Sequence, residues 1–132
     1  MNNNDHIRLS FPVNPAYVSS ARLTVSSIAN RIRLDVDEIE DIKTAVSEAC
    51  IYIIKRSTAR TAGNFEICFM PKKGEMSVEI VADDTGDLQS VPAEEMSLMM
   101  IKALVDEFTI TKPSCNQISI TMVKRHKADG VV

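Results

Sequence analysis

Two long segments of the chain carry apolar residues at the three- and four-residue steps of an α-helix. The clearer one spans residues 35–56, and the other spans about 14–33. Asp35 can cap the first turn of the later helix, and Glu38 stands three residues on as its capping-box partner. The apolar faces comprise Val18, Ala21, Val25, Ile28 and Ile32 in one helix and Val36, Ile39, Ile42, Val46, Ala49 and Ile53 in the other. Both segments are therefore predicted to be amphipathic helices that pack against a core.

Five shorter segments alternate apolar and polar residues, which is the pattern of a strand with one buried face. They span residues 6–12, 65–71, 75–82, 108–112 and 117–124. Turn residues at 72–74 and 113–116 join two pairs of these strands into expected hairpins, and a further helix is expected at about 92–107. The predicted order is β-α-α-β-β-α-β-β. We expect an α/β (α+β) two-layer sandwich, with helices on one face of a mostly antiparallel sheet.

The helix expected at about 92–107 is rich in methionine. Its apolar residues are Met96, Met99, Met100, Ile101 and Leu104. A methionine-rich stripe can serve as an adaptable binding surface. Such stripes belong more often to the core, so we predict that this one is buried.

Glu48 lies off the apolar face of the helix at 35–56. Its flank is shared with Asp41, Ala45 and Tyr52. A carboxylate at the edge of a buried face can point into a pocket beside the helix. The alternative is that Glu48 is one more solvated helix charge, which is the usual situation of such residues.

Length and composition suit one domain over residues 1–132, with a core at about 7–124 and a frayed tail from 125 onward. The net charge is −3, and no basic run accompanies aromatic residues, so direct nucleic-acid binding is not expected. No stretch approaches the roughly 20 apolar residues of a membrane span. The N-terminus lacks a signal-peptide pattern. These features favour a cytoplasmic protein that does not act in a membrane.

The cysteines and histidines give no sign of a metal site. Cys50, Cys68 and Cys115 are odd in number and widely spaced, so we expect reduced thiols. His6 and His126 lie near opposite ends of the chain. Neither a paired-histidine metal site nor a Cys–His catalytic pair is therefore expected.

Over residues 7–124 the chain resembles a known family. The matching segments are S-A-R-L-T-V-S-S in the first helix, D-E-I-E-D-I-K-T-A-V-S-E-A in the second, and I-K-A-L-V-D-E-F followed by T-I-T in the third helix and its exit strand. They are similar to the serine-protein kinase anti-sigma factors of the RsbW and SpoIIAB type, in the GHKL (histidine-kinase-like) ATPase superfamily. The resemblance implies a Bergerat-type ATP-binding fold and Mg-ATP as cofactor. It also implies a sigma factor and a STAS-domain anti-anti-sigma protein as partners, serine phosphorylation of the latter, and a homodimer.

The resemblance assigns roles to two residues of the second helix. Glu48, in S-E-A-C, matches the catalytic base near the attacking hydroxyl. Tyr52 stands four residues on, where the family has the asparagine that holds Mg²⁺. A neutral phenol is a poorer Mg²⁺ ligand than an amide oxygen. The chain therefore departs from the family pattern at the position of the Mg²⁺ ligand.

The adenine-binding box of the family, D-x-G-x-G, is incomplete in this chain. Strand phase puts Asp84 in the role of the adenine-binding aspartate, with Gly86 as the first glycine and Leu88 in place of the second. The other register uses Asp83 and puts Thr85 where a glycine is expected. The segment can also be read simply as a turn, because Asp, Thr and Gly favour turns.

The family's phosphate-binding glycines fall on Glu95 and Ser97 here. Glu95 adds negative charge where phosphates meet a helix N-terminus. Few residues separate Gly86 from this helix, so the family's ATP lid is expected to be cut away. Arg22, by contrast, matches an arginine near the family's partner surface, although by itself it would be read as a solvated charge.

We therefore predict an anti-sigma-factor-like transcription regulator that binds a sigma factor or a STAS-domain antagonist, with weakened or absent ATP binding. The alternative is an active ATP-dependent serine-protein kinase whose Mg²⁺ site uses other ligands. A third hypothesis is a structural subunit that uses the fold only as a scaffold.

Overall fold

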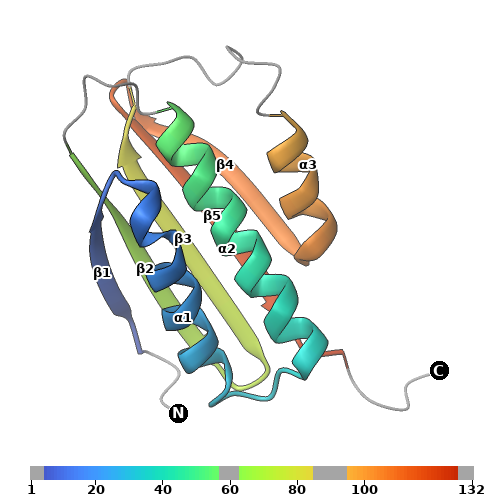
Figure 1. Ribbon diagram of the computed structural model, residues 1–132. Helices are drawn as coiled ribbons and strands as arrows, with labels where there is room; N and C mark the ends of the chain where they lie inside the picture. The colour runs from blue at the N-terminus through green and yellow to red at the C-terminus, as the bar shows by residue number, and fades with distance from the viewer. Residues whose placement is uncertain (1–4, 57–62, 85–94, 128–132) are drawn as a thin grey trace.

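Three α-helices lie on one face of a five-stranded sheet in the computed structural model, which describes residues 5–56, 63–84 and 95–127 (Figure 1). The strands are β1 (Ile7–Pro12), β2 (Asn64–Lys72), β3 (Glu75–Asp83), β4 (Glu107–Ser114) and β5 (Gln117–Arg125). The helices are α1 (Val18–Ala29), α2 (Val36–Arg56) and α3 (Glu95–Leu104), with a short 3-10 turn at Pro15–Tyr17 before α1. The predicted order of elements and the two-layer sandwich are confirmed.

The strands follow the order β1-β2-β3-β5-β4, and all neighbours are antiparallel. Both expected hairpins form, β2 with β3 and β4 with β5. Gly74 closes the first one with a φ of 73°, in the left-handed region that glycine adopts without strain. The adjacency of β3 and β5 brings the end of β3 beside the last hairpin, and this is where the candidate site lies.

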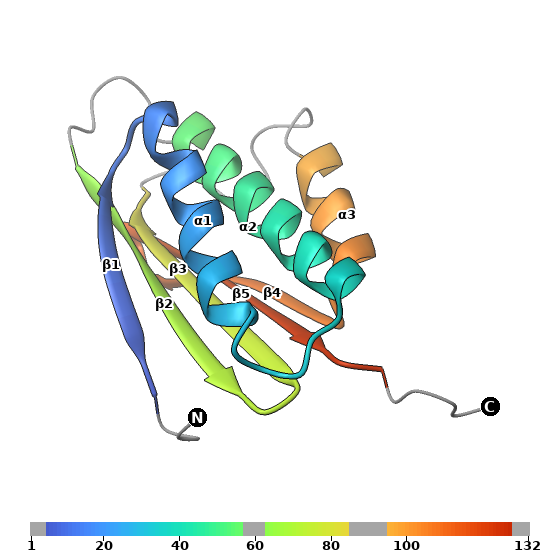
Figure 2. The same cartoon turned by 60° about the horizontal axis from the view of Figure 1, so that its bottom comes forward.

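The core fills the space between the sheet and the helices, and α2 is the central helix, between α1 and α3 (Figure 2). Its predicted apolar face is buried from Ile42 to Ile53, while Val36 at its start is 76% exposed. The alternating residues Phe65, Ile67 and Phe69 of β2 point into the same core. Burial of one sheet face explains the two-residue period seen along the strands.

Two helices end earlier than predicted. Helix α1 stops at Ala29 instead of continuing to about residue 33, because the chain turns there and places Ile32 and Leu34 in the core. Helix α3 stops at Leu104, and β4 already begins at Glu107. The expected start of α3 near residue 92 lies outside the described residues.

The prediction that the methionine stripe of α3 is buried was wrong. Met96, Met99 and Met100 are 77%, 67% and 48% exposed. The helix buries Ile101 and half-buries Leu98 and Leu104 instead. Apolar residues occupy both sides of α3, and its place at the margin of the helical layer leaves one side without a neighbour among the described helices and strands (Figure 1).

The chain beyond β5 is held more firmly than the frayed-tail prediction anticipated. The His126 backbone N–H donates to the Gly74 carbonyl at 2.8 Å, and the Lys127 N–H donates to Glu38 Oε2 at 2.8 Å. Residues 128–132 lie outside the described part. Among the helices that the structure describes, none is long and apolar enough to cross a membrane.

Candidate nucleotide and partner site

The N-terminus of α2 is fixed by the predicted capping box. The Asp35 backbone N–H donates to Glu38 Oε1 at 2.9 Å, and the Glu38 N–H donates to Asp35 Oδ1 at 2.8 Å. His126 Nδ1 lies 2.8 Å from the same Oε1, and the Lys127 backbone N–H donates to the other carboxylate oxygen. Glu38 is consequently 5% exposed and ties α2 to the end of β5.

Asp35, Glu38 and His126 also offer three ligand atoms within 4.8 Å of one another, a spacing compatible with a metal ion. Both Glu38 oxygens already accept hydrogen bonds, and the group sits at the positive end of the α2 dipole, which opposes a bound cation. Burial raises the pKa of the Glu38 carboxyl. Hydrogen bonds from the Asp35 backbone, His126 and the Lys127 backbone outweigh burial and bring the pKa below its usual 4.5. We therefore assign the cluster to helix capping.

One flank of α2 carries Glu48, Tyr52 and Arg56 at four-residue steps. Glu48 is half-buried, and it forms no hydrogen bond or ion pair with any described residue. Tyr52 is 1% exposed. Glu48 and Tyr52 lie on one flank of α2, as their spacing predicts. Arg56, the third residue of this flank, reaches the end of β3.

Asp84 is held by two cations from two different elements. Arg56 of α2 donates from Nε to Oδ1 at 3.0 Å and from Nη2 to Oδ2 at 2.8 Å, which is a bidentate pair. Lys112 of β4 donates from Nζ to Oδ2 and to the Asp84 carbonyl oxygen, both at 2.7 Å. The side chains of Arg56 and Asp84 are 4% and 3% exposed. This cluster therefore links α2, β4 and the end of β3 inside the protein.

The electrostatics of the cluster keep Asp84 ionised. Burial raises the pKa of the Asp84 carboxyl. Hydrogen bonds from Arg56 and Lys112, together with their positive charges, outweigh burial and hold the pKa below its usual 3.8. Three charge-assisted hydrogen bonds already end on this carboxylate.

Tyr52 takes part in the same arrangement. The Arg56 guanidinium carbon lies 5.7 Å from the centroid of the Tyr52 ring, and Arg56 Nη1 lies 3.5 Å from the phenol oxygen. A cation over an aromatic face is attracted by the ring quadrupole. The residue at the family's Mg²⁺-ligand position thus packs against a positive charge.

The remaining residues of the predicted nucleotide site are less closely associated. Asp84 is the buried member of the aspartate pair, while Asp83 is exposed at the end of β3. Ser97 is half-buried in the first turn of α3. Gly86 lies outside the described residues, as do the segment 85–94 and the side chain of Glu95.

Sequence reasoning missed Arg56 and Lys112 as members of this site. Arg56 stands in the last turn of α2, where a cation suits the helix dipole whatever else it contacts. Its spacing of four residues from Tyr52 was the available signal. Lys112 continues the inward phase of Phe108 and Ile110 in β4, and a lysine in an inward phase is itself a sign of a buried partner.

Arg22 lies on the side of α1 that meets α2. Its Nη1 donates to the Ser47 hydroxyl at 2.9 Å, and that hydroxyl donates to the Lys43 carbonyl at 3.0 Å. Arg22 is half-buried, and Leu23 beside it is 70% exposed. The seam between α1 and α2 therefore presents an oriented guanidinium next to an exposed apolar side chain.

Comparison with known proteins agrees with this architecture. The family of the histidine kinase-like ATPase domain matches residues 11–122. The fold is similar to part of a Mycobacterium tuberculosis chain that contains RsbU and RsbW domains (TM-score 0.74, 18% identity, 98% of this chain and 35% of that one). It is also shared with the SiaB–SiaC complex of Pseudomonas aeruginosa (TM-score 0.70, 10% identity, 89% of this chain and 88% of that one). The chain thus contains a histidine kinase-like ATPase domain.

Proteins of similar sequence identify the family within this class of domain. The chain is 32% identical to the serine-protein kinase RsbW of Oceanobacillus iheyensis, over 83% of this chain and 81% of that protein. It is 38% identical to the RsbW of Bacillus subtilis over 65% of this chain, a match that spans about half of that relative (53%). The chain belongs to the RsbW/SpoIIAB-type anti-sigma factor family.

Proposed function

We propose that this protein is a cytoplasmic partner-switching regulator that binds a sigma factor or a STAS-domain antagonist and has weak or no affinity for ATP. Membership of the family supports the class of partner. The observation that carries the loss of ATP binding is the engagement of Asp84 by Arg56 and Lys112.

The bonding at Asp84 competes directly with adenine. In the proposed family role, this carboxylate accepts a hydrogen bond from the neutral amino group of the base. The bonds from Arg56 and Lys112 join opposite charges, whereas the neutral adenine amino group would bond to the same carboxylate without that attraction between two charges. Three bonds already occupy most of the roughly four acceptor positions of a carboxylate that is only 3% exposed, so little of it is left for an adenine amino group to reach. The cluster therefore does not fit the base.

The position that corresponds to the family's Mg²⁺ ligand also argues against nucleotide binding. Tyr52 is buried, and the Arg56 guanidinium lies over its ring. A divalent cation at this place would meet a neutral phenol and a positive charge instead of an amide oxygen. The residues present do not fit Mg-ATP, so we derive no phosphoryl transfer for this chain. The half-buried carboxylate of Glu48 is the feature that keeps an active kinase as the second candidate.

Calorimetric titration of the purified protein with Mg-ATP and Mg-ADP tests the nucleotide part of the proposal. We expect neither heat nor a thermal shift at millimolar nucleotide, because a ligand that binds the native state raises its stability by mass action. Glu48→Ala serves as the control, since removal of a catalytic base alters turnover more than binding. Micromolar binding by the unmodified chain would reject the proposal and lead to kinase assays.

Partner binding is tested at the seam between α1 and α2. Arg22→Glu is expected to weaken binding of the cognate sigma factor or STAS-domain protein at least about tenfold, because arginine anchors at interfaces often contribute about 2 kcal/mol or more. Arg33→Glu, an equal charge change at an exposed residue beyond α1, is the matched control. Equal affinities of the two variants, measured by titration against each candidate partner, would exclude Arg22 from the interface.

A further inference from the structure

A hollow with a basic lining lies at the end of the molecule opposite Asp84. Its volume is about 270 Å³, and it is lined by Arg31, Ile32, Arg33 and Lys73. The two arginines belong to the connection between α1 and α2, and the lysine belongs to the β2–β3 turn. These two segments lie side by side in both views of the chain (Figure 1, Figure 2). The fold therefore brings three cations from distant parts of the sequence to one place.

The connection between α1 and α2 holds its two arginines on a fixed backbone. The Arg31 N–H donates to the Ile28 carbonyl at 3.0 Å, and the Leu34 N–H donates to the Ile32 carbonyl at 2.8 Å. Ile32 and Leu34 are 7% and 8% exposed and anchor the connection in the core. The arginines on either side of Ile32 are exposed. Their positions on the surface are thus set by the buried residues between and beside them.

The β2–β3 turn holds Lys73 in a similar way. Lys73 and Gly74 form a two-residue turn between Lys72 and Glu75, which face each other in the strand register. The Gly74 carbonyl accepts the His126 backbone N–H at 2.8 Å, so the turn is also tied to the end of β5. Cationic groups on backbone that is already ordered lose less freedom when a ligand binds.

The charges of the hollow are not used within the described part of the chain. Arg31, Arg33 and Lys73 form neither an ion pair nor a side-chain hydrogen bond with any described residue. Arg56 and Arg125, by contrast, both donate to carboxylates. The unpaired cations are therefore available to an anion from solution.

The carboxylates nearest along the chain do not line the hollow. Asp35 accepts the Glu38 N–H in the capping box, and Glu75 pairs with Lys72. Asp37 is exposed in the first turn of α2, where the helix dipole favours an acidic residue. The positive charge that lines the hollow is consequently not neutralised from inside it.

We propose that this hollow binds a phosphate group, carried either by a small soluble molecule or by a lipid headgroup. A guanidinium group offers parallel N–H donors that match two oxygens of a phosphate, and a lysine ammonium adds a point charge. Two arginines and one lysine can surround a dianion in this way. The bound phosphate would bridge the α1–α2 connection and the β2–β3 turn.

The hollow is separate from the candidate nucleotide site. The nine residues of β3 lie between the β2–β3 turn and Asp84, a length of roughly 30 Å. Phosphate in the hollow would therefore not compete with the bonds from Arg56 and Lys112 to Asp84. Binding here is independent of whether ATP binds at the other end of the sheet.

Backbone amide NMR shifts, followed during a titration with inorganic phosphate at constant ionic strength, test the site. We expect saturable shifts centred on residues 31–33 and 73–74, and none when chloride replaces phosphate. Arg31→Glu and Lys73→Glu are each expected to weaken the affinity at least about tenfold, because each removes a charge-assisted bond and adds a repelling carboxylate. The same spectra show whether each variant is folded.

Lys55→Glu is the matched control. It makes the same change in net charge at an exposed residue near the other end of α2. This variant is expected to bind phosphate as the unmodified chain does, because an exposed charge farther away than a Debye length of about 8–10 Å is screened.

Cosedimentation with vesicles distinguishes the two sources of the phosphate. The vesicles consist of phosphatidylcholine with phosphatidic acid, and vesicles of phosphatidylcholine alone are the comparison. Binding to the acidic vesicles that Lys73→Glu abolishes and Lys55→Glu retains would assign the phosphate to a lipid headgroup. Saturable shifts with inorganic phosphate, without vesicle binding, would assign it to a soluble molecule.

Three results would overturn the inference. They are the absence of binding in both experiments, shifts centred on Arg56 and Asp84 instead of on the hollow, and an equal loss of binding in the Lys55→Glu chain. Neither experiment uses nucleotide or a protein partner, so their failure would leave the proposed regulatory function untouched.

Discussion

At the scale of single residues, the interactions of Asp84 carry the proposed loss of ATP binding. The carboxylate is buried, ionised and bonded to Arg56 and Lys112. An arginine fork supplies planar, bidentate geometry, and lysine adds a point charge. Asp84, which resembles an adenine-binding aspartate, is therefore bonded to residues of the protein itself. These bonds connect three elements of the core.

Replacement of Arg56 tests the contribution of this cluster to stability. Arg56→Ala is expected to lower the free energy of unfolding by about 3 kcal/mol, the low end for a broken buried pair, because Lys112 still contacts Asp84. Urea unfolding at neutral pH measures the change. Arg125→Ala is the control, because its exposed pairs with Glu75 and Glu107 are expected to contribute within about 1 kcal/mol. Equal losses in the two variants would contradict a buried, specific pair.

At the scale of elements, the N-terminus of α2 is joined to distant parts of the chain through Glu38. One carboxylate caps its own helix and receives the end of β5 through His126 and Lys127. The His126 backbone in turn reaches the β2–β3 turn at Gly74. Helix position and sheet position are thereby coupled at a single side chain.

Glu38→Gln tests this coupling and its dependence on pH. At neutral pH the free energy of unfolding of the variant is expected to be lower by about 2 kcal/mol. The carboxylate accepts hydrogen bonds on both oxygens, whereas the NH₂ group of glutamine can only donate. The lowered pKa of Glu38 means that its contribution is present above its usual 4.5 and is lost as the pH falls through the native pKa. The difference between the two proteins, measured by urea unfolding, should therefore shrink below pH 4.5. A difference that grows on acidification would contradict the assignment.

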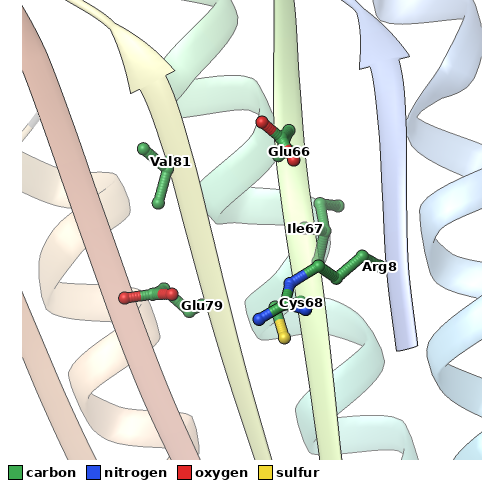
Figure 3. Close-up of a pocket in the computed structure, with 6 residues that line it drawn as sticks. All are labelled: Arg8, Glu66, Ile67, Cys68, Glu79 and Val81. Atoms are coloured by element: carbon green, nitrogen blue, oxygen red, sulfur yellow. The ribbon is translucent and has the colours of Figure 1, made fainter. Parts of the chain in front are cut away.

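At the scale of the whole molecule, the two faces of the sheet have different surroundings. Three helices cover one face and carry the candidate nucleotide site and the seam between α1 and α2 (Figure 2). The other face carries a hollow of about 190 Å³, lined by residues of β1, β2 and β3 that include Arg8 and Glu79 (Figure 3).

Much of the fold could be predicted because the responsible signals are local. Apolar residues at steps of three and four specify the buried face of α1 and α2, and alternation specifies the strands, since side-chain direction repeats with the geometry of each element. The capping box could also be predicted from the sequence, because Asp35 and Glu38 are three residues apart. A match over 11–122 to the histidine kinase-like ATPase domain agrees with the family that the helical motifs resemble.

The predicted burial of the α3 methionines failed for a different reason. Helix α3 has apolar residues on both sides, so its own pattern does not say which side is covered. Only the position of α2 and the sheet buries Ile101 and leaves Met96 and Met99 exposed.

The sequence by itself thus determined the elements, their order and the family, because those depend on residues a few positions apart. Only the tertiary structure decided the chemistry of the candidate site. Arg56 and Lys112 are each 28 residues from Asp84, and they meet it because α2 crosses the end of β3 and because β5 places β4 nearby. Burial then makes their charges effective, since low dielectric strengthens ion pairs that water would screen.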